Sequence, residues 1–391
     1  MFFVKPTNLK PVKSKVPAVP MGSIHFYDDI LKYFNNKPAK QQIKKGFKTI
    51  TFVTTGIIAY DGGQTTMLHL GSLLNELGYK VYYLSYVPQS RASMVKNAEF
   101  NYPGYRGTCV DVSQLDKHKS DLWVATLWES AYIIKNKPGY KLYFVQDYEP
   151  YFYAFGDRYQ LAKRTYELGL HMISLGPWCA KMIKENSNYS SPIDEINFPV
   201  DLTDYPFEKR GFKKYENKKT VKLAVYTKWD SPRRAPINIQ LILQNTQKLL
   251  KKKGIELKIT YFGTGKSKIF INGKNAGKLT KPEMVDLYHK SDFGIAPSMT
   301  NFSLVPFEMM SAGLPFIDFE EGTGAYFLEP NTYLSTKMNE YNLTQTIAQA
   351  LQQPKQLKRM VNAAADHLQN VTWKKTITDF MGILNGLEPI D

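Results

Sequence analysis

Residues 277–315 constrain the fold more than any other stretch of the chain. They read GKLTKPEMVDLYHKSDFGIAPSMTNFSLVPFEMMSAGLP. Thr280 followed three residues later by Glu283 is a capping box, so the pattern predicts a helix that begins there. Phe293–Ala296 is an apolar run without polar alternation, which is typical of a strand covered on both faces in a parallel sheet. A second helix is expected near Pro306, with another buried strand directly after it.

This order of elements predicts where a ligand would bind. The loop 298–308 should lie at the carboxyl ends of parallel strands, the edge at which open α/β sheets bind ligands. A helix N-terminus at the same place favours an anion. Glu308 lies near that N-terminus, where it either contacts a ligand or only complements the helix dipole. The pattern alone leaves both interpretations open.

The stretch resembles the nucleotide-sugar-binding signature of family 4 glycosyltransferases. The matching positions are Gly277, Leu279, Tyr288, Ser291, Asp292, Pro297, Ser298, Glu308, Gly313 and Pro315. The resemblance implies an α/β protein with the GT-B fold: two Rossmann-like parallel-sheet domains face each other across a cleft, and a C-terminal helix crosses back to the first domain.

The resemblance also implies roles for individual residues. Glu308 would hold the ribose of the donor, Leu279 would lie against the base, and the backbone amides of Phe302, Ser303 and Leu304 would hold the diphosphate. The family usually has another glutamate eight positions earlier that contacts the donor sugar. Thr300 occupies that position here.

Glycine-containing turns follow two of the predicted strands. Residues 49–54 form a first strand, and the turn containing Gly62 and Gly63 leads to a helix and a second strand at 81–84. Gly263 follows the strand 257–262. Glycines at such turns let backbone amides approach a ligand closely. In family 4 enzymes a glycine-rich loop at the first turn faces the donor diphosphate and the acceptor.

Polar and aromatic residues follow two further buried strands, at 121–126 and 141–145. They include Trp128 and Glu129 after the first strand, and Asp147, Glu149 and Tyr151 after the second. Aromatic rings stack on sugar faces and carboxylates accept hydroxyl hydrogens, so both groups suit a sugar acceptor. Asp147 and Glu149 are predicted to orient or deprotonate the acceptor hydroxyl, and the other three to bind the acceptor. Alternatively, the rings belong to the core and the acids are solvated.

The segment FVQDYEPYFYAFG, followed by YELGLHMISLGPWCAKMI, resembles bacterial rhamnosyltransferases of cell-surface polysaccharide and S-layer glycan assembly. Family 4 enzymes often carry a His-Asp pair where this chain has Gln146 and Asp147. Our hypothesis is that Gln146 contacts a 6-deoxy donor that lacks the hydroxyl such a histidine would reach. The favoured donor is therefore deoxythymidine-diphosphate rhamnose (dTDP-rhamnose).

Three cations, Lys228, Arg233 and Arg234, follow the predicted strand 221–226. Guanidinium and ammonium groups bind a diphosphate and stabilise the charge that develops on it as a leaving group. The ordinary alternative is a basic turn on the surface. The same rhamnosyltransferases carry basic residues in this loop, which favours the donor site and a catalytic role for both arginines.

At 391 residues the chain is long enough for two domains. The predicted parts are a basic arm with a short helix (1–48), an N-terminal acceptor domain (49–205), a C-terminal donor domain (206–371) and a crossover helix (372–391).

The net charge of +16 restricts the partners. The basic clusters carry no recognisable nucleic-acid-binding motif, so nucleic acid is not expected. An anionic membrane surface or a lipid-linked saccharide acceptor fits the charge, and a solvated surface is the plain alternative. No run approaches the ~18 apolar residues of a membrane span, and the N-terminus has no signal-peptide pattern. A cytoplasmic protein is expected, and peripheral contact with the inner face of the plasma membrane is an option that the charge leaves open.

The sequence thus predicts a hexosyltransferase that moves a sugar from a nucleotide-diphosphate donor to a growing cell-surface polysaccharide, with retention of configuration. No cofactor or metal is expected, because the six histidines show no ligand spacing. Two alternatives remain. Asp147 and Glu149 would hold a divalent ion in a metal-dependent GT-A transferase, or Thr300 would mark a catalytically reduced protein that binds glycans or a synthase partner.

Overall fold

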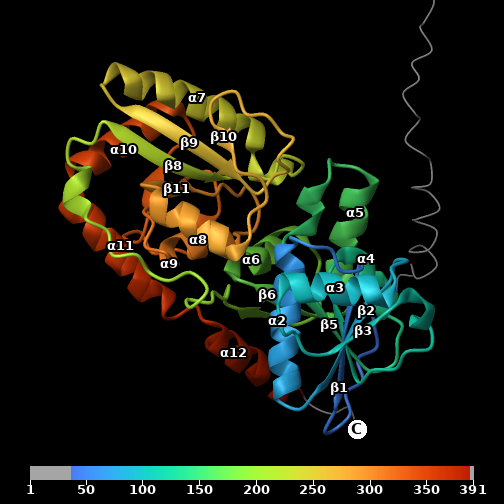
Figure 1. Cartoon of the computed structure of the whole chain (residues 1–391). Helices are drawn as coiled ribbons and strands as arrows, with labels where there is room; N and C mark the ends of the chain where they lie inside the picture. The colour runs from blue at the N-terminus through green and yellow to red at the C-terminus, as the bar shows by residue number, and fades with distance from the viewer. Residues whose placement is uncertain (1–36, 388–391) are drawn as a thin grey trace, which may run out of the picture.

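Two parallel β-sheets with flanking helices form two domains in the computed structural model, which describes residues 37–387 (Figure 1). The first sheet has the strand order β3-β2-β1-β4-β5-β6-β7, and the second has the order β10-β9-β8-β11-β12-β13. All strand pairings within both sheets are parallel. The predicted short helix near residues 24–34 and most of the basic arm lie outside the described residues.

The strands are β1 (Thr49–Thr54), β2 (Lys80–Ser85), β3 (Thr108–Val110), β4 (Leu122–Ala125), β5 (Tyr140–Val145), β6 (His171–Leu175), β7 (Ile193–Ile196), β8 (Thr220–Tyr226), β9 (Glu256–Phe262), β10 (Lys274–Asn275), β11 (Phe293–Ile295), β12 (Phe316–Phe319) and β13 (Leu334–Thr336). The helices are α2 (Gly62–Glu76), α3 (Arg91–Asn101), α4 (Trp128–Ile134), α5 (Asp157–Arg164), α6 (Pro177–Asn186), α7 (Pro236–Lys252), α8 (Lys281–Lys290), α9 (Leu304–Ser311), α10 (Glu340–Gln352), α11 (Pro354–Leu368) and α12 (Trp373–Asn385).

The continuous apolar runs of the sequence became the central strands. Every residue of β4, β6, β11 and β12 is buried, as expected for parallel strands covered on both faces. The short strands β3, β10 and β13 were not predicted, because two or three residues at or near a sheet edge leave no apolar run to recognise. Within residues 37–387, no helix has the length and apolar character needed to cross a membrane.

The strand order fixes the position of a ligand site. In the first sheet the chain proceeds outward from β1 to β3 and then returns to β4 on the other side of β1. In the second sheet it proceeds from β8 to β10 and returns to β11. Each reversal leaves a crevice at the carboxyl ends of the two central strands, which is where doubly wound sheets bind ligands.

The C-terminal helix crosses back to the first domain, as predicted. Helix α12 contacts β7 and α2, and Figure 1 shows it extending from the second domain to lie beside α2. Val200 and Thr372 form a parallel bridge just before this helix. The rings of Trp373 and His69 stack with their centroids 3.7 Å apart. The two sheets lie within 49–196 and 220–336, and the residue-level domain boundaries stay a prediction.

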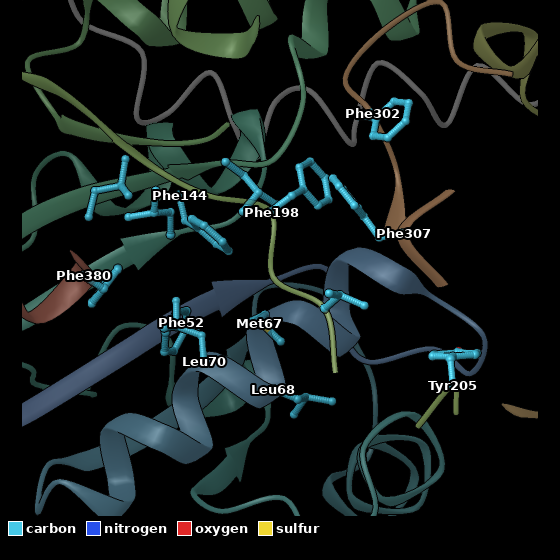
Figure 2. Close-up of a cluster of buried hydrophobic side chains, with 14 of the residues drawn as sticks. Phe52, Met67, Leu68, Leu70, Phe144, Phe198, Tyr205, Phe302, Phe307 and Phe380 are labelled. Atoms are coloured by element: carbon cyan, nitrogen blue, oxygen red, sulfur yellow. The ribbon is translucent and has the colours of Figure 1, made fainter. Parts of the chain in front are cut away.

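A hydrophobic cluster continues from one domain to the other (Figure 2). Phe144 belongs to β5 of the first domain and Phe307 to α9 of the second, and both are buried. Phe198, in the segment between the domains, lies 6.1 Å from Phe307 between ring centroids. Phe380 brings α12 into the same cluster. The domains therefore share apolar surface in addition to polar contacts.

The crossover helix should contribute to stability through Phe380, which is fully buried. Phe380→Ala is expected to lower the free energy of unfolding by about 3 kcal/mol, because it removes a large buried side chain and leaves a cavity. Urea denaturation followed by tryptophan fluorescence measures this change. Tyr341→Ala, at a residue that is 69% exposed, is the control and should stay within about 0.5 kcal/mol of the wild type. Equal midpoints for both variants would contradict the assigned role of Phe380.

Candidate active site

A cleft of about 840 Å³ lies between the two domains and is lined by residues of both. Every predicted donor-binding residue lines this cleft, and so do the two acids that follow β5: the residues are Gly62, Gly63, Gln146, Asp147, Glu149, Lys228, Arg233, Arg234, Gly263, Leu279, Phe302, Ser303, Leu304 and Glu308. Residues far apart in the sequence thus meet at the carboxyl ends of the strands.

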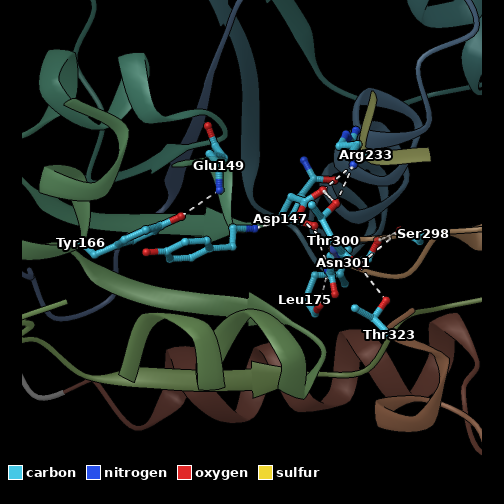
Figure 3. Close-up of polar contacts among 11 residues, drawn as sticks. Asp147, Glu149, Tyr166, Leu175, Arg233, Ser298, Thr300, Asn301 and Thr323 are labelled. Carbon is cyan, nitrogen blue, oxygen red and sulfur yellow. Dashed lines mark hydrogen bonds and ion pairs between the residues drawn. The ribbon is translucent and has the colours of Figure 1, made fainter. Parts of the chain in front are cut away.

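Asp147 connects the two domains at the centre of the cleft (Figure 3). It follows β5 in the first domain, and its carboxylate is buried. One oxygen, Oδ2, accepts a hydrogen bond from Thr300 Oγ1 at 2.9 Å, and the other, Oδ1, accepts from the backbone amide of Asn301 at 3.0 Å. Arg233 forms an ion pair with Oδ2. All three partners belong to the second domain.

Asn301 adds two more bonds between the domains. Its side-chain amide donates to the carbonyl of Gln146 at 2.8 Å and to the carbonyl of Leu175 at 2.9 Å. Gln146 directly follows β5, and Leu175 is the last residue of β6. The loop 298–301 is in turn held inside its own domain, because Thr323 Oγ1 donates to the carbonyl of Thr300 at 2.6 Å. Sequence analysis did not identify Asn301, since nothing in its surroundings distinguishes it from a loop asparagine.

Thr300 occupies the position at which family 4 glycosyltransferases usually carry a glutamate, and it has a structural role here. Thr300 is buried and bonds Asp147, as described above. Its hydroxyl also lies 3.4 Å from Nη1 of Arg233. Arg233 itself covers the ring of Phe152, at 4.7 Å from its centroid. We refer below to Asp147, Arg233, Thr300 and Asn301 as the interdomain cluster.

Arg234 differs from Arg233 because it forms no ion pair with any residue that the structure describes. Pro232–Arg234 forms a short 3₁₀ helix, and Ala235, in the left-handed region at φ 46°, is the N-cap residue of α7. This turn directs Arg234 inward, where only 7% of its surface is exposed. Its Nη1 has no hydrogen-bond partner among the described residues. Burial, reinforced by the neighbouring charge of Arg233, lowers the pKa of Arg234 to about 10.

Lys228 and the N-terminus of α2 add to the positive side of the cleft. Burial lowers the pKa of Lys228, while the carboxylate of Asp61 acts in the opposite direction. Asp61 caps α2 by accepting from the amide of Gln64 at 2.9 Å. A Cβ on Gly63 would lie 3.3 Å from the side-chain oxygen of Gln146, so the glycine turn and Gln146 are close neighbours. A side chain on that turn would crowd the mouth of the cleft.

Glu308 lies on α9, half-buried between two tyrosines. The hydroxyl of Tyr288 is 3.5 Å from Oε2, and Tyr205 faces the same carboxylate. Burial raises the pKa of Glu308 to about 7, although Tyr205 and Lys281 oppose that rise. Glu308 therefore changes its charge close to neutral pH. Tyr205 was not identified from the sequence, because it lies in the irregular segment between the domains.

Glu149 points away from the interdomain cluster (Figure 3). Its Oε2 accepts from the amide of Trp128 at 2.8 Å, and its Oε1 accepts from the hydroxyl of Tyr143 at 2.7 Å. Burial, together with the nearby charge of Glu129, raises the pKa of Glu149 to about 8. Burial also raises the pKa of Glu129 to about 7.

The three predicted acceptor-binding residues lie outside the lining of this cleft. The ring of Trp128 is buried and donates to the hydroxyl of Tyr153 at 2.9 Å. Glu129 is close to Glu149 within the first domain. Tyr151 is 44% exposed and lies near Trp178. Their role in acceptor binding stays a prediction.

The contacts of the two acids do not favour the metal-dependent GT-A alternative. Both oxygens of Asp147 are bonded to groups of the second domain. Those of Glu149 are bonded to Trp128 and Tyr143. The part of the chain that the structure describes contains no group of three or more His, Cys, Asp or Glu side chains arranged to hold a metal ion. The fold itself, identified below, gives the stronger argument.

Comparison with known proteins gives one sequence relative and many structural ones. No protein-family model matches the chain. The O-antigen biosynthesis protein RfbC of Myxococcus xanthus is 24% identical over 279 residues, which are 68% of this chain and 21% of RfbC. The chain therefore corresponds to about a fifth of the length of that relative.

Two solved structures show the fold. Anabaena HepE, in complex with UDP and glucose, superposes with a TM-score of 0.68 at 11% identity, over 87% of this chain and 100% of HepE. TarM of S. aureus, in complex with fondaparinux, α-GlcNAc-glycerol and UDP, superposes with a TM-score of 0.67 at 10% identity, over 87% of this chain and 100% of TarM. The chain has the GT-B fold of these proteins, as predicted, and this fold does not favour the GT-A alternative.

The interdomain cluster should hold the domains together without a ligand. Asp147→Asn removes the counter-charge of Arg233 and leaves two uncompensated arginines side by side. We expect the free energy that holds the two domains in contact to fall by about 2 kcal/mol. This is less than for a fully buried pair, because the Arg233 side chain is 26% exposed. Small-angle X-ray scattering should then show a larger radius of gyration. Asp286→Asn, which breaks an exposed ion pair with Lys290, is the control. An unchanged radius of gyration in Asp147→Asn would mean that other contacts set the closure.

Proposed function

We propose that the protein is a glycosyltransferase that binds a nucleotide-diphosphate sugar in the cleft and transfers the sugar to a growing cell-surface glycan. The observation that carries this proposal is Arg234, a buried cation with an unpartnered Nη1 that lines the cleft. An unpaired buried charge is costly, so a site that retains one is built for an anion that arrives from solution. A diphosphate supplies that anion.

The surrounding groups fit the rest of a nucleotide sugar. Lys228 and the amides at the N-terminus of α9 complete the diphosphate site, because a helix N-terminus attracts negative charge. Glu308, one turn into α9, holds the ribose hydroxyls when it is ionised. Leu279, which also lines the cleft, lies against the base. Gly62 and Gly63 let backbone amides approach the phosphates from the first domain.

The chemistry requires stabilisation of a leaving group more than a dedicated base. As the bond from the sugar to the diphosphate breaks, negative charge develops on the phosphate, and Arg234 and Lys228 stabilise it. Asp147 and Glu149 already have hydrogen-bond partners. This fits a retaining transferase in which the donor phosphate accepts the proton of the acceptor hydroxyl.

We also propose which nucleotide sugar is the donor and which class of glycan is the acceptor. We favour dTDP-rhamnose as the donor because Gln146, beside the glycine turn, replaces a histidine that contacts a sugar hydroxyl in family 4 enzymes. HepE and TarM were solved with UDP, which keeps a uridine donor as the second choice. RfbC is an O-antigen biosynthesis protein, so a surface polysaccharide, or its lipid-linked precursor, is the proposed acceptor. Activity with a glucose donor and none with dTDP-rhamnose would contradict the role of Gln146.

A non-catalytic glycan-binding protein remains the alternative from another class. It was suggested by the missing glutamate at position 300. Thr300 bonds Asp147 across the cleft, however, so its presence has a structural explanation that does not require loss of activity.

Arg234→Met tests the donor site. Methionine has a similar length without the charge, so the unliganded variant should melt at the wild-type temperature or above it, because a costly buried cation is gone. The increase in melting temperature that deoxythymidine or uridine diphosphate causes in the wild type should disappear. The measurement is a thermal-shift assay with and without EDTA, and Arg359→Met, at an exposed arginine of α11, is the control. A nucleotide-induced shift that survives in Arg234→Met rules out the proposed site, and one that requires a divalent ion would support a metal-dependent mechanism.

Donor affinity should depend on pH through Glu308. The pKa of this group is raised to about 7, so the carboxyl is protonated below that pH and then accepts ribose hydroxyl hydrogens poorly. With a sugar diphosphate that does not titrate near neutrality, affinity should be about tenfold weaker at pH 6 than at pH 8. Isothermal titration calorimetry gives the values. Glu308→Gln should bind weakly at both pH values, and a pH dependence that persists in this variant would assign it to another group.

A further inference from the structure

A surface of the second domain, away from the lining of the cleft, combines exposed isoleucines with an almost uninterrupted positive charge. Ile269 is 81% exposed and Ile271 is 67% exposed, in the loop between β9 and β10. Ile237 (62%) and Leu241 (50%) lie one turn apart on α7. None of these four side chains lines the cleft. The donor site therefore does not account for them.

The loop and the helix form one surface because Asn272 ties them together. The side chain of Gln247 on α7 donates to the carbonyl of Asn272 at 3.0 Å, and the side chain of Asn272 lies 3.5 Å from the carbonyl of Gln240. Phe270, between the two isoleucines in the chain, is buried and stacks on Tyr261 with the ring centroids 4.0 Å apart. This anchoring directs the isoleucines at 269 and 271 outward. Figure 1 shows α7 and β10 at the same end of the second domain.

The charge of this region is one-sided. Between residues 231 and 282 the only acidic residue is Glu256, whereas the cations outside the lining of the cleft are Lys248, Lys251, Lys252, Lys253, Lys258, Lys266, Lys268 and Lys274. Lys222 and Lys258 even face each other on adjacent strands, a pairing of like charges that weakens a sheet. Lys266 and Lys274 are exposed on either side of the two isoleucines. Mutual repulsion opposes contact with the same surface of a second copy.

We propose that this surface, formed by α7 and the loop 266–274, binds an anionic lipid bilayer. Exposed aliphatic side chains enter the boundary between headgroups and acyl chains, and each lysine near an anionic membrane surface adds attraction. A polyanion such as a nucleic acid would use the lysines but has no apolar region for the isoleucines. The combination of both therefore favours the bilayer. The inference rests on the exposed surface alone and stands independently of the transferase reaction.

Vesicle flotation of the full-length protein tests this inference. The wild type should bind phosphatidylcholine vesicles that contain about 30% phosphatidylglycerol more strongly than pure phosphatidylcholine vesicles, and added salt should weaken the binding. The double variant Ile269→Ser with Ile271→Ser should bind the anionic vesicles about tenfold more weakly. A double variant Lys266→Gln with Lys274→Gln should show a comparable loss.

Matched controls separate the outcomes. Leu77→Ser with Val95→Ser removes two exposed aliphatic residues from the first domain and should leave vesicle binding unchanged. The thermal shift caused by a nucleotide should be intact in the isoleucine variant, so a failure of vesicle binding is separate from a failure of the donor site. Three results would overturn the inference: no preference for anionic vesicles, binding that the isoleucine variant retains while the lysine variant loses it, or equal loss in the control. If the lysine variant loses binding while the isoleucine variant retains it, the surface is a polyanion site. If the wild type is a dimer and the isoleucine variant is not, the isoleucines mediate self-association instead.

Discussion

The geometry of the cleft depends on the contacts that the carboxylate of Asp147 makes with the second domain. This carboxylate lies at the end of β5 in the first domain, yet Arg233, Thr300 and Asn301, its partners across the cleft, come from the second. These hydrogen bonds are directional, whereas the contacts within the hydrophobic cluster shared by the domains are not. The cluster around Asp147 therefore sets how the glycine turn of one domain faces the cationic loop of the other. A donor site formed by both domains needs that orientation before it can bind.

The same carboxylate distinguishes two adjacent arginines. Asp147 compensates Arg233, which also lies over Phe152, so this guanidinium is largely committed to holding the domains together. Arg234 forms no ion pair within residues 37–387, feels Asp147 only as a nearby charge, and is buried with an unpartnered nitrogen. A fold retains an unsatisfied buried group at a cost in stability, and such costs are typical of functional sites. Of the two arginines, Arg234 is thus the stronger candidate for the diphosphate ligand.

Much of this arrangement could be predicted from sequence, because parallel strands are continuous apolar runs and their carboxyl ends meet at one edge. That argument placed Gly63, Lys228 and Glu308 in one cleft. It could not pair Thr300 with Asp147, which are 153 residues apart and belong to different domains. It also could not show that the ring of Trp128 is enclosed, since an aromatic residue after a strand fits a core and a binding site equally well. Composition gave the charge but not its location beside exposed isoleucines.

The donor site and the exposed surface of α7 are physically connected through Trp229. This residue follows Lys228, and its amide donates to Thr264 at the end of the neighbouring strand β9. On its other side, the ammonium group of Lys268 lies 3.2 Å from the centroid of the Trp229 ring, and Phe270 meets the same ring edge-on. Ile269 and Ile271 flank Phe270 in the chain. The exposed isoleucines therefore belong to a loop that packs against the residue next to Lys228, so the outer surface and the cationic turn of the cleft are parts of one packed unit.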